Sequence, residues 1–132
     1  MNTSLIIYII DDDTDDQDFL IEAIKEIDAS IECYSAMNGQ EGLNKLETGA
    51  IPFPSLIFLD LNMPRIGGYK FLTAIKEHSK FKSIPVVIYT TSDNEKDRHE
   101  MLQLGAMDYV VKQASFSLLM ENLHTIFLWA AK

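Results

Sequence analysis

The side chains of this chain that could carry chemistry include three aspartates that follow short apolar segments. Asp11 and Asp12 come directly after residues 5–10, and Asp60 comes directly after residues 56–59. A carboxylate at the end of a buried strand is costly unless it is paired, hydrogen-bonded or bound to a metal ion. Three carboxylates brought close together repel one another, and a hard divalent cation such as Mg²⁺ relieves that repulsion. The three aspartates are therefore candidate ligands of Mg²⁺.

A hydroxyl group and an amine follow two further apolar segments. Thr90 comes directly after residues 84–89, and Lys112 comes directly after residues 107–111. An ionised Asp60 with one free oxygen can act as a nucleophile toward phosphorus. The negative charge of the transferred group could then be neutralised by Mg²⁺, by the Lys112 ammonium and by the Thr90 hydroxyl. These residue types predict the transfer of a phosphoryl group to Asp60.

The elements that must position these side chains alternate between strands and helices. We expect strands at residues 5–10, 31–36, 56–59, 84–89 and 107–111, and helices at residues 15–27, 38–46, 69–79, 93–104 and 115–130. Such alternation is typical of a parallel sheet that is covered by helices on both faces. All five strands then end at one edge of the sheet, where ligand sites of such folds lie. The sequence predicts an α/β fold, a doubly wound five-stranded parallel sheet flanked by five helices, in a single domain of residues 1–132.

The composition argues against several classes of function. Twenty acidic residues against 11 basic ones give a formal charge of −9, which argues against partners such as nucleic acid or an anionic membrane. No apolar run approaches the roughly 18 residues that a membrane-spanning helix needs. The single cysteine, Cys33, cannot form a disulfide within the chain, which fits a reducing compartment. We therefore expect a cytoplasmic protein.

Taken in this order on the predicted strand ends, the motifs resemble those of the receiver domain of two-component response regulators. The matching residues are Asp11-Asp12, the segment Asp60-Leu61-Asn62-Met63-Pro64, Thr90 and Lys112. The resemblance covers essentially the whole chain. It is to the stand-alone, single-domain kind related to the chemotaxis regulator and to regulators that partner phytochrome-type kinases. It implies a flavodoxin-like fold with the receiver topology and no output domain. It also implies a phosphoacceptor switch, which catalyses its own phosphorylation and dephosphorylation, in place of a metabolic enzyme.

The resemblance implies a role for each residue around the phosphoacceptor. Asp60 would accept the phosphoryl group, and Lys112 would bind that group. Asp12 would be a direct Mg²⁺ ligand, and Asp11 would hold a water molecule of the metal. The backbone carbonyl of Asn62 would be a further ligand, and Asp60 itself would complete the metal site.

The resemblance also implies a set of switch residues. Thr90 would be the switch hydroxyl that moves to the phosphoryl group, and Tyr109 would be the aromatic residue that swings inward with it. Thr91 would control access to the phosphoryl group, and its size favours slower dephosphorylation than the Ala or Gly that is common there. Gln113 stands in place of the proline that usually follows the lysine with a cis bond, which leaves the Lys112–Gln113 bond open to either isomer.

The implied partners are proteins. A sensor histidine kinase or a histidine phosphotransfer protein would supply the phosphoryl group, and a downstream protein target would read the switch. Helix 115–130 carries more apolar residues than one buried stripe requires. The residues beside or beyond that stripe are Leu118, Met120, Leu128 and Trp129. They either pack against the body of the domain or form a partner or homodimer face with helix 93–104 and strand 107–111.

Other interpretations stand beside this one. Acidic residues fall at positions 1, 3, 5 and 12 of an EF-hand calcium loop, namely Asp11, Asp13, Asp15 and Glu22. Position 6 of that loop needs glycine, and here it is Asp16. The motif Asp60-x-Asn62 resembles the nucleophile motif of Mg²⁺-dependent phosphatases of the haloacid dehalogenase type, for whose cap 132 residues leave no room. A pseudo-receiver that keeps the fold as a binding module is disfavoured, because every acid, hydroxyl and lysine position is present.

Overall fold

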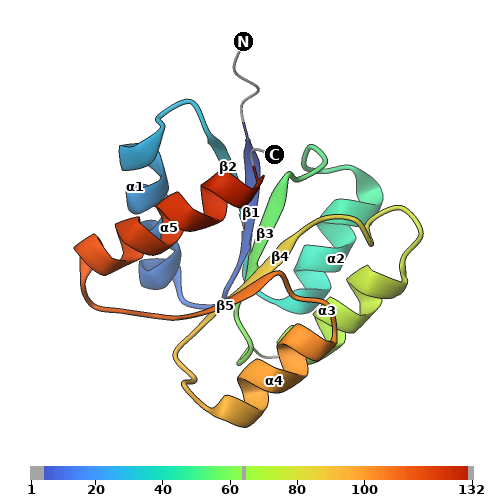
Figure 1. Cartoon of the computed structure of the whole chain (residues 1–132). Helices are drawn as coiled ribbons and strands as arrows, with labels where there is room; N and C mark the ends of the chain where they lie inside the picture. The colour runs from blue at the N-terminus through green and yellow to red at the C-terminus, as the bar shows by residue number, and fades with distance from the viewer. Residues whose placement is uncertain (1–4, 64, 131–132) are drawn as a thin grey trace.

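The sheet has the predicted architecture. In the computed structural model, which describes residues 5–63 and 65–130, five parallel strands form one sheet in the order β2-β1-β3-β4-β5 (Figure 1). The strands are β1 (Ile6–Ile10), β2 (Glu32–Ala36), β3 (Leu56–Leu59), β4 (Val86–Thr90) and β5 (Asp108–Val111). Because β1 and β3 pair with each other, the segments that follow these two strands start side by side.

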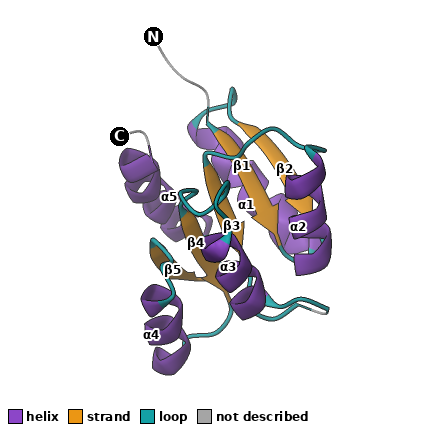
Figure 2. Cartoon of the chain, turned by 90° about the vertical axis from the view of Figure 1, so that its right-hand side faces the viewer, coloured by secondary structure: helices purple, strands orange, loops and turns teal. Residues whose placement is uncertain are grey.

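Among the described residues, five helices cover both faces of the sheet. They are α1 (Thr14–Ile27), α2 (Gly39–Thr48), α3 (Gly68–Glu77), α4 (Glu95–Gln103) and α5 (Phe116–Ala130). The helices α1 and α5 pack together on one face, and α2, α3 and α4 lie on the other (Figure 2). None of the helices in the described part of the chain is long and apolar enough to cross a bilayer. The predicted doubly wound α/β fold is confirmed.

The apolar residues of each strand divide between two cores, one on each face of the sheet. In β1, Ile7 and Ile9 belong to the core beneath α1 and α5, whereas Tyr8 and Ile10 belong to the core beneath α2, α3 and α4. All four residues of β3 are buried, because strands flank it on both sides and helices cover it on both faces. This double burial explains the continuous apolar run that precedes Asp60.

Side-chain caps set the helix starts near the strand ends. Asp13 caps α1 by accepting a hydrogen bond from the Asp16 N–H at 3.1 Å, so this helix begins one residue earlier than predicted. Asn94 caps α4 with its side-chain oxygen, so α4 begins at Glu95 and not at Asp93. The caps place the first turns of both helices beside the edge of the sheet where the strands end.

Other predicted boundaries shift slightly. The strand β4 begins at Val86, after Pro85, which has no N–H to donate to a strand ladder. The same strand includes Thr90. The helix α2 continues to Thr48 and is followed by Gly49 as its C-cap. The φ of Gly49, 73°, lies in the left-handed region that glycine adopts at little cost.

Candidate functional site

The three predicted carboxylate ligands lie together at the carboxyl edge of the sheet. Asp11 and Asp60 follow the paired strands β1 and β3, and the Asp60 N–H donates to Ile10 O at 3.0 Å. One carboxylate oxygen from each of Asp11, Asp12 and Asp60 lies within 4.8 Å of the others. Asp11 and Asp60 are 2% and 7% exposed, whereas Asp12 is exposed. This cluster suits a divalent metal ion, because hard cations prefer several carboxylate oxygens at short range.

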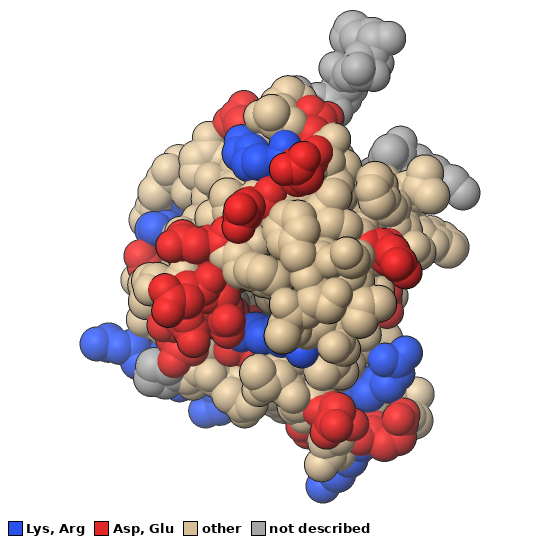
Figure 3. Space-filling view, turned by 90° about the vertical axis from the view of Figure 1, so that its left-hand side faces the viewer, with Lys and Arg blue, Asp and Glu red and all other residues tan. Residues whose placement is uncertain are grey.

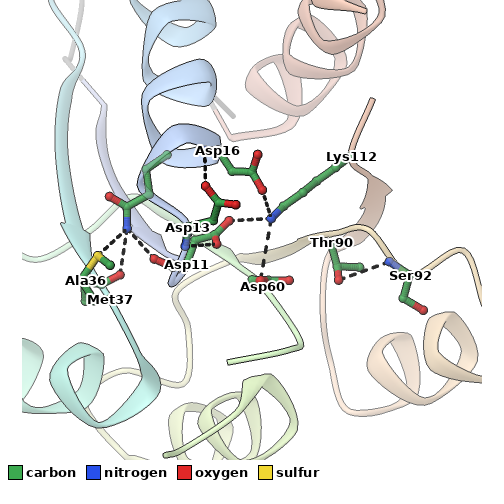
Figure 4. A network of polar contacts seen from close by, with 10 residues as sticks. Asp11, Asp13, Asp16, Ala36, Met37, Asp60, Thr90, Ser92 and Lys112 are labelled. Carbon is green, nitrogen blue, oxygen red and sulfur yellow. Dashed lines mark hydrogen bonds and ion pairs between the residues drawn. The ribbon is translucent and has the colours of Figure 1, made fainter. Parts of the chain in front are cut away.

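Lys112 reaches the same cluster from the end of β5 (Figure 4). Its Nζ lies 2.8 Å from Asp11 Oδ2, 2.7 Å from Asp16 Oδ2 and 3.8 Å from Asp60 Oδ2. Its backbone N–H donates to Thr90 O at 2.7 Å, which ties the residue to β4. No cis peptide bond occurs in the described residues, so the bond that follows Lys112 is trans. The predicted lysine is in the cluster, and Asp16 is a partner that the sequence reasoning did not single out.

The surroundings of Lys112 keep it charged. Burial alone lowers the pKa of a lysine, but the hydrogen bonds to Asp11 and Asp16 and the charge of Asp60 raise the pKa of Lys112 above its ordinary value. Burial raises the pKa of the Asp11 carboxyl, and the hydrogen bonds that it accepts from Lys112 and from the Asp13 N–H offset part of that rise. The site therefore holds a fixed positive charge among its carboxylates.

A buried amide orients the segment that carries Asp11. Gln17 on α1 is 6% exposed, and its Nε2 donates to Asp11 O at 2.6 Å and to Ala36 O at 3.1 Å. It therefore ties the end of β1 to the end of β2. The sequence reasoning missed both Gln17 and Asp16. The available signal was their helical spacing from the buried Leu20, which places both on the inward side of α1.

The two predicted switch residues meet at Ser92. Thr90 is completely buried, and its Oγ1 accepts a hydrogen bond from the Ser92 N–H at 3.5 Å. The Tyr109 ring is already buried, at 4% exposure, and its hydroxyl donates to Ser92 O at 2.9 Å. The Ser92 Oγ donates to Asp97 Oδ2 at 2.7 Å, and Arg98 Nη1 donates to Tyr109 O at 3.3 Å. Both switch residues are thus connected to α4 through one serine, and their movement stays a prediction.

Close backbone contacts hold the loop after β3. The Gly39 N–H donates to Ile66 O at 3.0 Å, and a Cβ on Gly39 would lie 2.1 Å from that oxygen. The Gly68 N–H donates to Leu61 O at 3.0 Å, and a Cβ on Gly68 would lie 2.8 Å from Leu61 Cα. Only glycine fits at either position without a shift of the backbone. These contacts fix the two ends of the loop that carries Asn62.

The rim of the site is exposed and acidic. Asn62 follows Asp60 by two residues and Thr91 follows Thr90 directly, and both are exposed. The exposed acids of the neighbouring segment are Asp12, Asp13, Asp15 and Asp18. Figure 3 views the face that carries α1 and α5 and shows acidic side chains gathered along one side of it. The roles of Asn62 and Thr91 stay predictions.

Comparison with known proteins identifies relatives of the whole domain. The family model of the response regulator receiver domain matches residues 7–124. The chain is 31% identical over 110 residues to the sensor histidine kinase CheAY of Helicobacter pylori, an alignment that covers 83% of this chain and only 13% of that kinase. It is 31% identical over 115 residues to the response regulator Rcp1 of Synechocystis, covering 84% of this chain and 78% of that protein.

Solved structures agree with these relatives. The phosphorylated cyanobacterial phytochrome response regulator RcpA superposes with a TM-score of 0.85 at 30% identity, covering 94% of this chain and 91% of that one. The Mn²⁺-bound form of Rcp1 gives a TM-score of 0.84 at 28% identity, covering 97% and 95% of the two chains. The family match over most of the chain, the fold and the clustered acids agree with one another. The chain belongs to the family of response regulator receiver domains, the phosphoacceptor modules of two-component signalling.

Proposed function

We propose that this chain is a phosphorylation switch in which Asp60 accepts a phosphoryl group and thereby changes a protein-binding surface. The observation that carries the proposal is the position of the Asp60 carboxylate. It is buried, it shares an oxygen cluster with Asp11 and Asp12, and it lies 3.8 Å from the Lys112 ammonium. A carboxylate held between a metal site and a fixed cation has the surroundings that a phosphoryl acceptor needs.

We infer that Mg²⁺ is the metal of this site. Asp12 and Asp60 would bind it directly, Asp11 would hold one of its water molecules, and the backbone carbonyl of Asn62 would be a further ligand. When bound, the ion would neutralise charge on the phosphoryl oxygens. The Mn²⁺-bound structure of the relative Rcp1 supports a divalent ion here.

The phosphoryl donor would be a phosphohistidine of a sensor histidine kinase or of a histidine phosphotransfer protein. An Asp60 oxygen forms a bond to phosphorus, the P–N bond to the histidine breaks, and its electron pair stays on the imidazole ring. Lys112 donates an N–H to one equatorial oxygen and the Thr90 hydroxyl donates to another. Water later hydrolyses the acyl phosphate, and Thr91 at the rim would slow its approach. The domain would thus catalyse its own phosphorylation and dephosphorylation without being a metabolic enzyme.

The signal would leave the site through Ser92. This serine contacts Thr90, Tyr109 and Asp97, so a movement of Thr90 toward the phosphoryl group would alter contacts of α4 and β5. Such a local change can bias an interaction surface between two states.

The surface that would change is formed by α4, β5 and α5. Met120 on α5 is half-buried and packs against the core of the α1–α5 face. Leu118, Leu128 and Trp129 are 46%, 69% and 65% exposed. The apolar residues of α5 are therefore divided between the core and the surface. We infer that the exposed ones would contact a downstream protein or a second copy of the chain.

Intact-mass spectrometry after incubation with acetyl phosphate and Mg²⁺ tests the phosphoacceptor role. We expect a gain of one phosphoryl group in the wild-type protein, and no gain in the Asp60→Asn variant or in the presence of EDTA. A wild-type protein that binds Mg²⁺ but gains no mass would contradict the proposal and favour a pseudo-receiver.

A further inference from the structure

A fourth aspartate enters the site from α1. The Lys112 Nζ lies within hydrogen-bond distance of Asp16 Oδ2 and Asp11 Oδ2, at 2.7 and 2.8 Å, but stays 3.8 Å from Asp60 Oδ2. Figure 4 shows the ammonium directed between these carboxylates. Two acids that are not the phosphoacceptor therefore hold the ammonium.

The position of Asp16 is set by the first turn of α1. Its N–H donates to the capping side chain of Asp13 at 3.1 Å, and it lies one helical turn before the buried Leu20. The Asp16 side chain is 37% exposed, whereas that of Lys112 is 10% exposed. Asp15 lies in the same turn of α1 and is exposed. The contact with Lys112 thus distinguishes Asp16 from its acidic neighbour.

The three distances indicate different roles for the carboxylates of Asp11, Asp16 and Asp60. An ammonium has three N–H donors, and here two of them have acceptors on Asp11 and Asp16. A lysine paired directly with the attacking oxygen of Asp60 would stabilise the lone pair that must bond to phosphorus and would make that oxygen a weaker nucleophile. An ammonium held a short distance away leaves the oxygen free and keeps its third N–H for the incoming group.

We propose that Asp16 is a positioning residue for phosphoryl transfer, which together with Asp11 holds Lys112 off the Asp60 oxygen but within reach of the incoming phosphoryl group. The inference rests on the proposed role of Asp60. Without the Asp16 charge, the ammonium is left with the carboxylates of Asp11 and Asp60 and moves toward Asp60. That move occupies the attacking oxygen and competes with a metal ion for it.

The reaction with acetyl phosphate shows the consequence for rate. An Asp60 oxygen bonds to phosphorus, the bond from phosphorus to the acetate oxygen breaks, and acetate leaves with the electron pair. Lys112 keeps its proton throughout and only changes partners. Loss of Asp16 therefore slows formation of the acyl phosphate. It does not shorten the life of the acyl phosphate, because Lys112 is then free to stay on the phosphoryl group.

The test compares Asp16→Asn with Asp15→Asn, which removes the same charge from the same helical turn. Three quantities are measured for each variant: the phosphorylation rate with acetyl phosphate, the phosphoryl lifetime after donor removal, and the Mg²⁺ dissociation constant by calorimetry without donor. For Asp16→Asn we expect phosphorylation about three- to fivefold slower, which is the size expected for one partly exposed charge pair. We also expect weaker Mg²⁺ binding and an undiminished lifetime. Asp15→Asn should change each quantity less than about twofold.

A third variant, Asp16→Glu, keeps the charge and should recover most of the lost rate. Phosphorylation of Asp16→Asn at the wild-type rate, or slowed no more than in Asp15→Asn, would overturn the role of Asp16. A slow Asp16→Asn variant with a lifetime shortened in proportion would also overturn it, since general disorder of the site would act on both. Failure of the wild-type protein to be phosphorylated would instead remove the proposed function itself.

Discussion

In this site a single positively charged side chain lies close to several negatively charged ones. Lys112 is close to Asp11, Asp16 and Asp60, and Asp11 is almost completely buried. A buried carboxylate that loses its partner retains the cost of leaving water. The metal-free protein should therefore depend on Lys112 for stability as well as for chemistry.

Replacing Lys112 tests that dependence. Without Mg²⁺, we expect Lys112→Met to lower the free energy of unfolding by about 2 kcal/mol. The loss of a fully buried ion pair would cost more, but Asp16 is partly exposed. Lys45→Met is the control, since Lys45 is 34% exposed, pairs with Glu41 at 3.1 Å and donates to Ser35 O at 2.8 Å. Its loss should cost about 1 kcal/mol. Urea unfolding at pH 7.5 measures both.

The stability of Lys112→Met should also depend on pH differently from that of the wild-type protein. Burial raises the pKa of Asp11, so the folded protein binds a proton there more readily than the unfolded chain does. Lowering the pH toward 5 should therefore stabilise the fold through this group, and more so without Lys112. The stability gap between wild type and Lys112→Met should shrink on acidification. A gap that widens, or equals that of Lys45→Met throughout, would contradict this account.

Among the elements, α2 supports the loop that follows Asp60. Its first residue, Gly39, donates to Ile66 O, and any side chain there would meet that oxygen at 2.1 Å. The loop between β3 and α3 carries Asn62, whose backbone carbonyl is a proposed metal ligand. The start of one helix therefore restrains the loop that carries a proposed ligand.

Gly39→Ala should displace this loop. We expect it to destabilise the fold by about 1–3 kcal/mol, as overpacking does, and to weaken Mg²⁺ binding. Gly49→Ala is the matched control, because Gly49 has a φ of 73° and open space around it. That change should cost about 1 kcal/mol of stability from backbone conformation alone and leave Mg²⁺ affinity unchanged. Calorimetric titration and urea unfolding measure both effects, and equal Mg²⁺ affinities in the two variants would rule out the support role.

The elements also show what the sequence could and could not predict. The buried runs that end at Asp60 and Thr90 predicted interior strands, because burial on both faces requires continuous apolar residues. Because the strands are parallel, the sequence also predicted that the acids and Lys112 lie at the same edge of the sheet. Helical spacing from Leu20 could have placed Asp16 and Gln17 on the inward side of α1, but the groups that they contact depend on how α1 is rotated against the sheet, which residue spacing does not specify. Ser92 was missed because its contacts with Thr90 and Tyr109 use its backbone N–H and carbonyl, which leave no pattern of residue types.

At the scale of the whole molecule, the site and the exposed part of α5 lie on different parts of one fold. A cavity of about 200 Å³ lies between β5 and α5, lined by Met107, Asp108, Thr125, Ile126 and Trp129. With the exposed apolar residues of α5, it makes this side of the molecule the proposed place where phosphorylation is read.

Light scattering coupled to size exclusion tests whether a second copy binds there. We expect phosphorylation to increase the dimer fraction, and Leu128→Glu, which places a charge on an exposed apolar position, to abolish that increase. The matched control is Tyr69→Glu on α3, an exposed apolar position outside the surface of α4, β5 and α5, which should leave the increase unchanged. A monomer in both phosphorylation states would remove the homodimer proposal and leave a different protein as the reader of this surface.

Receipt of the phosphoryl group by Asp60 can be tested at the residue itself. Protein treated with acetyl phosphate and Mg²⁺ can be reduced with borohydride, which converts an aspartyl phosphate to homoserine, and its peptides can then be sequenced by mass spectrometry. We expect homoserine at position 60, and none there after the donor or Mg²⁺ is omitted. Homoserine at position 11 or 12, or a phosphoryl group on another side chain with position 60 unchanged, would contradict this expectation.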